Sequence, residues 1–94
     1  MGPVLRWNSE KARSNLRKHG VTFEEAASVF RDVLSVTIND PLHSTEESRL
    51  VTIGRSDQDR TLVVAHSEVG ETIRVISARL ATRGERREYE EGTL

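Results

Sequence analysis

The spacing of hydrophobic positions changes from a helical to a strand period about one third of the way along the chain. Between Phe23 and Phe30, apolar side chains recur three and four positions apart, as in a helix that buries one face. From Leu34 to Ile38, apolar and polar residues alternate, which is typical of a half-buried strand. Three further stretches have strand character, and they are residues 49–54, 61–67 and 72–78. The pattern therefore predicts helices followed by four strands.

Capping residues define the ends of the two predicted N-terminal helices. Asn8 or Ser9 can accept hydrogen bonds from the first turn of a helix that ends at Gly20, where a positive φ is favourable. Thr22-Phe23-Glu24-Glu25 fits a capping box for the second helix, in which the Glu25 carboxylate returns to the Thr22 amide. The two helices are therefore expected to follow one another almost directly.

The connections between the four predicted strands are short. Because a parallel crossover needs a dozen or more residues, these strands have to be largely antiparallel. Thr82-Arg83-Gly84-Glu85 offers a second capping box, which predicts a short final helix through Tyr89 to Glu91. We therefore expect one α+β domain over residues 1–94, with two N-terminal helices, a four-stranded antiparallel sheet and a C-terminal helix (ααββββα). The helices are expected to pack on one face of the sheet.

Composition narrows the classes of protein that the chain can represent. Its 94 residues contain no cysteine, which excludes a disulfide framework and a thiolate metal site. His19, His43 and His66 lie far apart without ligand spacing, so that no metal and no other cofactor is predicted. The apolar runs are too short for a membrane span, and the first residues lack the apolar core of a signal peptide. We expect a soluble, cytoplasmic protein with no membrane partner.

Charge is distributed unevenly, although the formal net charge is only -1. Residues 1–19 carry five lysines and arginines against one glutamate, whereas residues 20–48 carry six acidic residues against one arginine. The first region could meet phosphate, and the second could receive a basic protein or simply keep the domain soluble. Arg74 and Arg79 lie within a strand-forming segment that a basic run follows, so that a rigid sheet would present guanidinium groups to phosphate oxygens.

Three sequence blocks stand in a fixed order along the chain. They are Lys18-His19-Gly20-Val21-Thr22-Phe23-Glu24-Glu25-Ala26, Leu62-Val63-Val64-Ala65-His66 and Ile73-Arg74-Val75-Ile76-Ser77-Ala78-Arg79. They are accompanied by Trp7-Asn8, Lys11 and Asn15 before the first block, and by Ala81-Thr82, Glu85-Arg86-Arg87 and Tyr89-Glu90 after the last. From Trp7 to about Glu91, the chain resembles the BrnT toxins.

The resemblance implies a fold, an activity and partners. BrnT toxins are RelE-like ribonucleases of type II toxin–antitoxin pairs, and such toxins halt translation. A BrnA-type antitoxin neutralises them and also binds the operator DNA. The resemblance thus implies metal-independent cleavage of messenger RNA, which the ribosome delivers in some RelE relatives.

Candidate catalytic residues follow from the chemistry of metal-free RNA cleavage, which needs proton transfer and stabilisation of phosphate charge. RelE-like families typically place an arginine late in the final strand, which favours Arg79 for the phosphate charge; the alternative is a salt bridge to Glu25 or Glu85. Arg74 is a second candidate, although strict alternation puts it on the opposite face of the strand unless the strand twists or bulges. His66 or His43 would move protons.

Each histidine also has a structural interpretation. His66 is in phase with Leu62 and Val64, so it could be a hydrogen-bonded core histidine. His43 lies in an acidic segment and could be merely solvated. His19 fits a helix C-terminus, where the dipole favours its protonated form, and it could border an RNA groove.

The remaining candidates would bind RNA. Lys11 and Lys18 lie two helical turns apart and could follow a phosphate backbone, or they could form an ordinary solvated face. Trp7 is more typical of a core anchor than of a base-stacking residue. The C-terminal candidates for base stacking or phosphate contact are Arg83, Arg86 and Tyr89.

Two further hypotheses remain beside the ribonuclease. The chain could be an inactive homologue that serves as a co-repressor with its antitoxin. It could also bind DNA directly, but a recognition helix needs base-reading side chains on an exposed face, and the second predicted helix is acidic.

Overall fold

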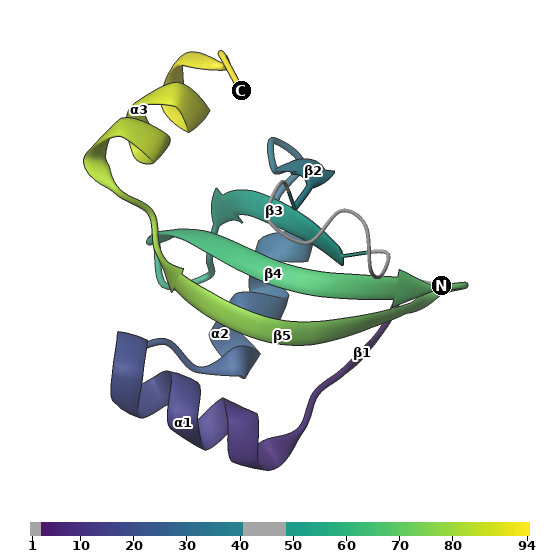
Figure 1. The fold of residues 1–94 in the computed structure, drawn as a ribbon. Helices are drawn as coiled ribbons and strands as arrows, with labels where there is room; N and C mark the ends of the chain where they lie inside the picture. Colours follow the sequence, from purple (N-terminus) through teal and green to yellow (C-terminus); the bar gives the residue numbers. More distant parts are fainter. Residues whose placement is uncertain (1–2, 41–48) are drawn as a thin grey trace.

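A computed structural model describes residues 3–40 and 49–94 of the chain. The helices are α1 (Ser9–His19), α2 (Phe23–Ser28), the single 3-10 turn η1 (Val29–Arg31) and α3 (Arg83–Glu91). The strands are β1 (Val4–Arg6), β2 (Val36–Asn39), β3 (Arg49–Arg55), β4 (Thr61–Val69) and β5 (Thr72–Leu80). The predicted helices and the four predicted strands are present (Figure 1). In these two ranges no helix combines the length and apolar character that crossing a membrane requires.

The sheet has five strands in the order β1-β5-β4-β3-β2, so the predicted four-stranded sheet was incomplete. The additional strand, β1, pairs with β5 in parallel and places Leu5 opposite Ile73. The other three pairings are antiparallel, as expected. The sheet is therefore mixed, and the chain order begins with a strand rather than with a helix.

One face of the sheet carries the hydrophobic core. Figure 1 shows α2 behind β3 and β4, where its Phe23 and Ala26 are fully buried. Leu62, Val64 and the other core residues of the strands complete the cluster, against which Trp7 packs. The Trp7 ring meets Phe23 edge-on at a centroid distance of 6.1 Å. Trp7 thus serves as the core anchor that the sequence favoured.

α1 lies beside β5 and is attached by a polar residue. It begins after the N-cap Asn8 and ends at Gly20, whose φ of 68° is in the left-handed region, as predicted. Asn15 is buried and donates from Nδ2 to the carbonyl of Ala78 at 2.8 Å, while its Oδ1 accepts from the Ala78 amide at 3.0 Å. Its Nδ2 also donates to the carbonyl of Val21. Asn15 therefore pairs with β5 as a neighbouring strand would.

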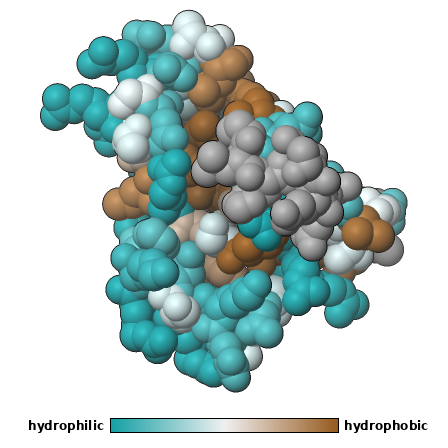
Figure 2. Space-filling model, in the orientation of Figure 1, coloured by the Kyte–Doolittle hydropathy of each residue, from teal (hydrophilic) through white to brown (hydrophobic). Residues whose placement is uncertain are grey.

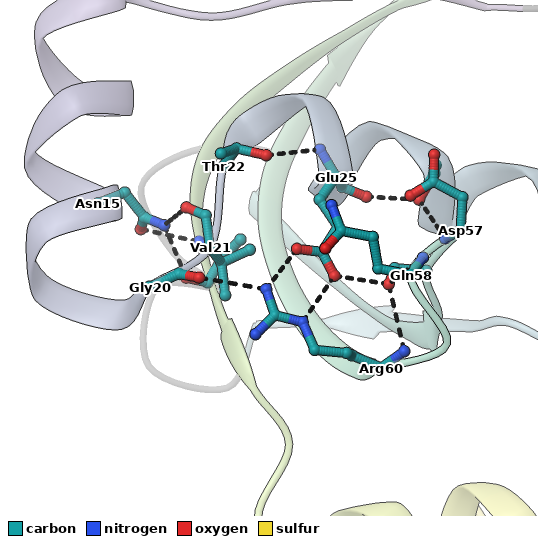
Figure 3. A network of polar contacts seen from close by, with 11 residues as sticks. Asn15, Gly20, Val21, Thr22, Glu25, Asp57, Gln58 and Arg60 are labelled. Carbon is teal, nitrogen blue, oxygen red and sulfur yellow. Dashed lines mark hydrogen bonds and ion pairs between the residues drawn. The ribbon is translucent and has the colours of Figure 1, made fainter.

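A partly buried ion pair joins α2 to the turn between β3 and β4 (Figure 3). Arg60 donates to both carboxylate oxygens of Glu25, and Ser56 donates to Oε2 at 2.7 Å. Thr22 caps the helix by accepting from the Glu25 amide, as predicted. The predicted return bond from the Glu25 carboxylate is wrong, because that carboxylate binds Arg60 and Ser56 instead. Being 3% exposed, Glu25 also cannot belong to an acidic surface for a partner.

α3 follows β5 and lies apart from the other two helices (Figure 1). Its predicted capping box is present, with Thr82 accepting from the Glu85 amide and the Glu85 carboxylate accepting from the Thr82 amide. Glu85 borders the face of the sheet that points away from the core. The expectation that all helices share one face is therefore wrong for α3. That opposite face is called the outer face below.

β2 is a more exposed strand than its alternation suggested. Its residues are half-buried or exposed because it forms one edge of the sheet. Leu34 precedes the strand and is 70% exposed, so the predicted start of this strand was two residues too early.

Candidate nucleic-acid interface

A β-bulge in β5 determines which way its arginines point. His66 of β4 pairs with Val75, but the preceding residue Ala65 pairs with Ser77, so that Ile76 is an extra residue. Val75 and Ala78 consequently both face the core and are 1% exposed. Arg74 and Arg79, which strict alternation would place on opposite faces, both lie on the outer face.

Arg79 lines a pocket of about 400 Å³ on the outer face. The floor is a row of cross-strand neighbours from four strands, namely Ile38, Val51, Ala65 and Ser77. Ile53 and Val63 extend this floor toward Arg79, and the rim carries His19, Asp40 and Glu85. The pocket therefore combines an apolar floor with an arginine, a histidine and two carboxylates.

Glu85 holds Arg79 by two bonds from Nη1 and Nη2, at 2.8 and 2.9 Å. Nη1 also donates to the carbonyl of Leu80. These bonds raise the pKa of Arg79 and lower that of Glu85 to about 2, because each charge stabilises the other. The salt bridge to Glu85, foreseen as the alternative role of Arg79, is present. The salt bridge and the bond to Leu80 together occupy three of the five N–H donors of the guanidinium, so that two remain for another ligand.

A second pocket of about 450 Å³ adjoins the first along β4 and β5. Arg49, Ser67, Arg74 and Arg6 are successive cross-strand neighbours on β3, β4, β5 and β1, and all line this pocket. Lys11, Val69, Thr72 and Ile76 complete the lining. Among the described residues, four cations and no carboxylate line this pocket, which is called the arginine-row pocket below.

α1 contributes one residue to each pocket. Lys11, Asn15 and His19 are spaced by one helical turn each, so they share a helix face. Because Asn15 is fixed to β5, Lys11 reaches the arginine-row pocket and His19 reaches the Arg79 pocket. Lys18 is exposed and lines neither pocket.

His66 is in the core and faces neither pocket. Its side chain is 0% exposed, its Nε2 shares a 2.7 Å hydrogen bond with Thr52 Oγ1, and its ring packs edge-on against Phe30. Burial lowers its pKa to about 4, so the imidazole is neutral, and the approach of Nδ1 to Glu68 at 3.7 Å is no ion pair. The structure therefore favours the core interpretation, because RNA cannot reach this ring.

The other predicted residues have separate locations. His43 lies outside the described residues. Tyr89 is half-buried, and its hydroxyl donates to Asp32; burial, followed by Asp32, raises its pKa to about 12. Tyr89 therefore docks α3 onto the segment before β2, which disagrees with the expectation of an unburied stacking residue. Arg83 and Arg86 are exposed on α3 and line neither pocket.

Arg6 and Arg49 were absent from the predicted site. Each begins or ends a strand, and only the register of the sheet brings them beside Arg74. The excess of basic residues in positions 1–19 was a signal for Arg6. Arg49 follows an acidic stretch, so local charge gave no signal for it.

Comparison with known proteins gives one family and one fold. The family model described as "Ribonuclease toxin, BrnT, of type II toxin-antitoxin system" matches residues 7–85. The crystal structure of the Brucella abortus ribonuclease toxin BrnT is similar, with a TM-score of 0.66 and 23% sequence identity over 88% of this chain and 100% of that one. No curated protein matches significantly. The match covers most of the chain, which therefore belongs to the BrnT family of type II toxin–antitoxin toxins.

Proposed function

We propose that this toxin is a metal-independent endoribonuclease that inhibits translation by cleaving messenger RNA. The family is described as ribonuclease toxins, which supports the reaction class. The observation that carries the proposal is the shared orientation of Arg74 and Arg79. The bulge at Ile76 puts both guanidinium groups on one sheet face, where each lines one of two adjoining pockets.

The proposed reaction is attack of a ribose 2′-hydroxyl on the adjacent phosphorus. The new O–P bond replaces the bond to the 5′-oxygen, which leaves with a proton, and a 2′,3′-cyclic phosphate remains. Arg79 would stabilise the additional negative charge through the two N–H donors that Glu85 and Leu80 leave free. Glu85 is a positioning residue, because it fixes the plane of the guanidinium.

His19 is the proposed proton-transfer residue at this pocket. Its ring is exposed and borders the same pocket as Arg79, whereas His66 is enclosed in the core. An imidazole has one ring nitrogen that can accept a proton and one that can donate it, which suits a general acid–base role. The apolar floor of Val51, Val63 and Ala65 would support the flat face of a base.

The proposed partners are an antitoxin of the BrnA type and, through it, operator DNA. A type II toxin has a protein antitoxin, and exposed acidic residues such as Glu24 could meet a basic partner. The net charge of -1 limits attraction to free RNA, so delivery of the messenger by the ribosome would suit this chain.

Two experiments test the proposed function. Expression in bacteria should arrest growth, and co-expression of the neighbouring antitoxin gene should relieve the arrest. The purified protein should cut single-stranded RNA in excess EDTA and leave 2′,3′-cyclic phosphate ends. An RNA with 2′-deoxyribose at the cut positions should stay intact. Cleavage of the deoxy substrate, or complete dependence on added metal, would contradict the mechanism.

A second candidate function is a non-catalytic module that acts with its antitoxin as a co-repressor. The engagement of Arg79 by Glu85 favours this candidate, because the ion pair already satisfies much of the guanidinium. Unaffected growth without the antitoxin, combined with operator binding only as a complex, would distinguish it from the ribonuclease.

A further inference from the structure

We propose that the arginine-row pocket is a second phosphate-binding subsite, which holds an RNA phosphate other than the one at Arg79. The inference rests on the proposed function only in naming RNA as the ligand. The four cations of the arginine-row pocket come from three strands and from α1, and they surround a volume of about 450 Å³. Such a subsite would fix the register of the RNA without taking part in bond cleavage.

The sheet register makes the row of arginines rigid. Arg74 is the Cα partner of Arg6 on β1 and of Ser67 on β4, and Ser67 is in turn the partner of Arg49 on β3. Adjacent strands are about 4.8 Å apart. The guanidinium groups therefore start from fixed and closely spaced backbone positions, which suits a ligand with several acceptor oxygens.

The cations of this pocket form no ion pair with any carboxylate that the structure describes. Over residues 3–40 and 49–94, the ion pairs of arginine involve Arg31, Arg55, Arg60 and Arg79, and none of the four pocket cations. Glu68, which follows Ser67, contacts His66 on the core side rather than the pocket. Within residues 3–40 and 49–94, the positive charge of the pocket is therefore not neutralised by an ion pair.

An unneutralised row of this kind opposes folding. Like charges directly opposite on neighbouring strands are destabilising, and Arg6 and Arg74 are such a pair. Nε of Arg49 is also buried, and no hydrogen-bond acceptor for it is found among residues 3–40 and 49–94. A bound phosphate would relieve both costs, because its oxygens accept hydrogen bonds and its charge offsets the repulsion.

The subsite is separate from the Arg79 pocket, although both lie on the outer face. Arg79 is opposite Val63 and Arg74 is opposite Ser67, which are four residues apart on β4. At roughly 3.3 Å per residue, the two positions are about 13 Å apart, which is too far for one phosphate to contact both. Ser77 and Ile76 connect the pockets along β5. A single strand of RNA along β5 could therefore place one of its phosphates at each pocket, with at least one further nucleotide between them.

Binding of an uncleavable RNA tests the subsite independently of catalysis. The probe is a fluorescent single-stranded oligonucleotide with 2′-O-methyl ribose throughout, and its affinity is measured by anisotropy over a range of salt concentrations. The variant is Arg49→Gln/Arg74→Gln. The matched control is Arg13→Gln/Arg17→Gln, which removes the same charge from exposed residues of α1 outside this pocket.

The row variant should bind the RNA at least tenfold more weakly than the control variant. The slope of log affinity against log salt should become shallower by about 0.7 for each lost phosphate contact, whereas the control keeps a slope close to that of the parent. In buffer without phosphate, the row variant should melt no lower than the parent, because it loses like-charge repulsion. Added inorganic phosphate should raise the melting temperature of the parent more than that of the row variant.

Several results would overturn the subsite. The first is that the parent protein does not bind the oligonucleotide. The second is that the two double variants have equal affinities and equal salt slopes. The third is that the row variant binds RNA normally but no longer binds an acidic protein partner. Failure of the proposed function looks different. In that case the parent cuts no RNA, yet the row variant still loses its affinity for the uncleavable strand.

Discussion

Arg74 and Arg79 face the same side of the sheet although they are an odd number of residues apart, because Ile76 bulges out of β5 between them. The bulge keeps Val75 and Ala78 in the core on either side of it. It thereby allows one strand to supply cations to two adjoining pockets.

The outer face is flanked by strongly hydrophilic surface over α1, and hydrophobic residues show between the α1 and α3 ends of the molecule (Figure 2).

Deletion of Ile76 should be tolerated, because Ile76 is the extra residue of the bulge. Without it, strict alternation still places Val75 and Ala78 on the core face and Arg74 and Arg79 on the outer face. We expect the deletion to lower the free energy of urea unfolding by about 1 to 3 kcal/mol, as for an ordinary substitution. Ile76→Val, which keeps the residue count, should cost about 1 kcal/mol or less. A loss well above about 4 kcal/mol on deletion would show that Ile76 is not the extra residue of this strand.

Replacement of Glu85 by glutamine should remove an acid-sensitive contribution to stability. The pKa of Glu85 is lowered to about 2 in the folded state, chiefly by Arg79, so its contribution is present above pH 4.5 and is lost as pH falls toward 2. Glu85→Gln should lower the unfolding free energy by about 1 to 2 kcal/mol at neutral pH. The difference from the parent should vanish near pH 2. Glu88→Gln, at an exposed position of α3, should show no such dependence.

His66 should give the domain a separate pH dependence at higher pH. Its folded pKa of about 4 lies below the usual 6.5 because the ring is buried, so the unfolded chain takes up the proton first as pH falls. Stability should therefore decrease between pH 6.5 and 4, by roughly 3 kcal/mol in total. His66→Gln, measured by urea unfolding across this range, should abolish that decrease. An unchanged pH profile would contradict the burial of a neutral imidazole.

The ion pair between Glu25 and Arg60 should be important for folding. The Glu25 side chain is 1% exposed, and glutamine in its place removes the negative charge and puts an NH2 group where one oxygen accepts from Arg60 or Ser56. We expect Glu25→Gln to lower the unfolding free energy by about 3 kcal/mol. Glu24→Gln, at the neighbouring exposed position, should change it by less than about 0.5 kcal/mol. Similar effects of the two substitutions would disprove the importance of the pair.

Local sequence signals predicted most of the fold. Apolar periodicity located α2 and the strands β3 to β5, and Asn8, Gly20 and Thr82 marked helix ends that the structure confirms. β1 was missed because three residues form no detectable period, and its pairing with β5 depends on contacts far apart in the chain. The same limitation applied to Glu25, whose real partner Arg60 lies 35 residues away.

The candidate site was predictable only where one strand or one helix face carried it. Arg74, Arg79 and Lys11 were identified from local pattern, and each lines a pocket of the outer face. The bulge that aligns the two arginines depends on pairing with β4, so alternation alone predicted opposite faces. Arg6 and Arg49 join the row through the register of three strand pairs, which no local signal reveals.

The central claim is that Arg79 stabilises the reacting phosphate. The most direct measurement is the rate of RNA cleavage in excess EDTA by Glu85→Gln and by the double variant Arg79→Ala/Glu85→Gln, once urea unfolding has shown both to be folded. Glu85→Gln keeps the guanidinium and removes the ion pair, so it isolates the catalytic contribution of Arg79. We expect the double variant to cleave at least about 100-fold more slowly than Glu85→Gln. Equal rates for the two variants would contradict the claim.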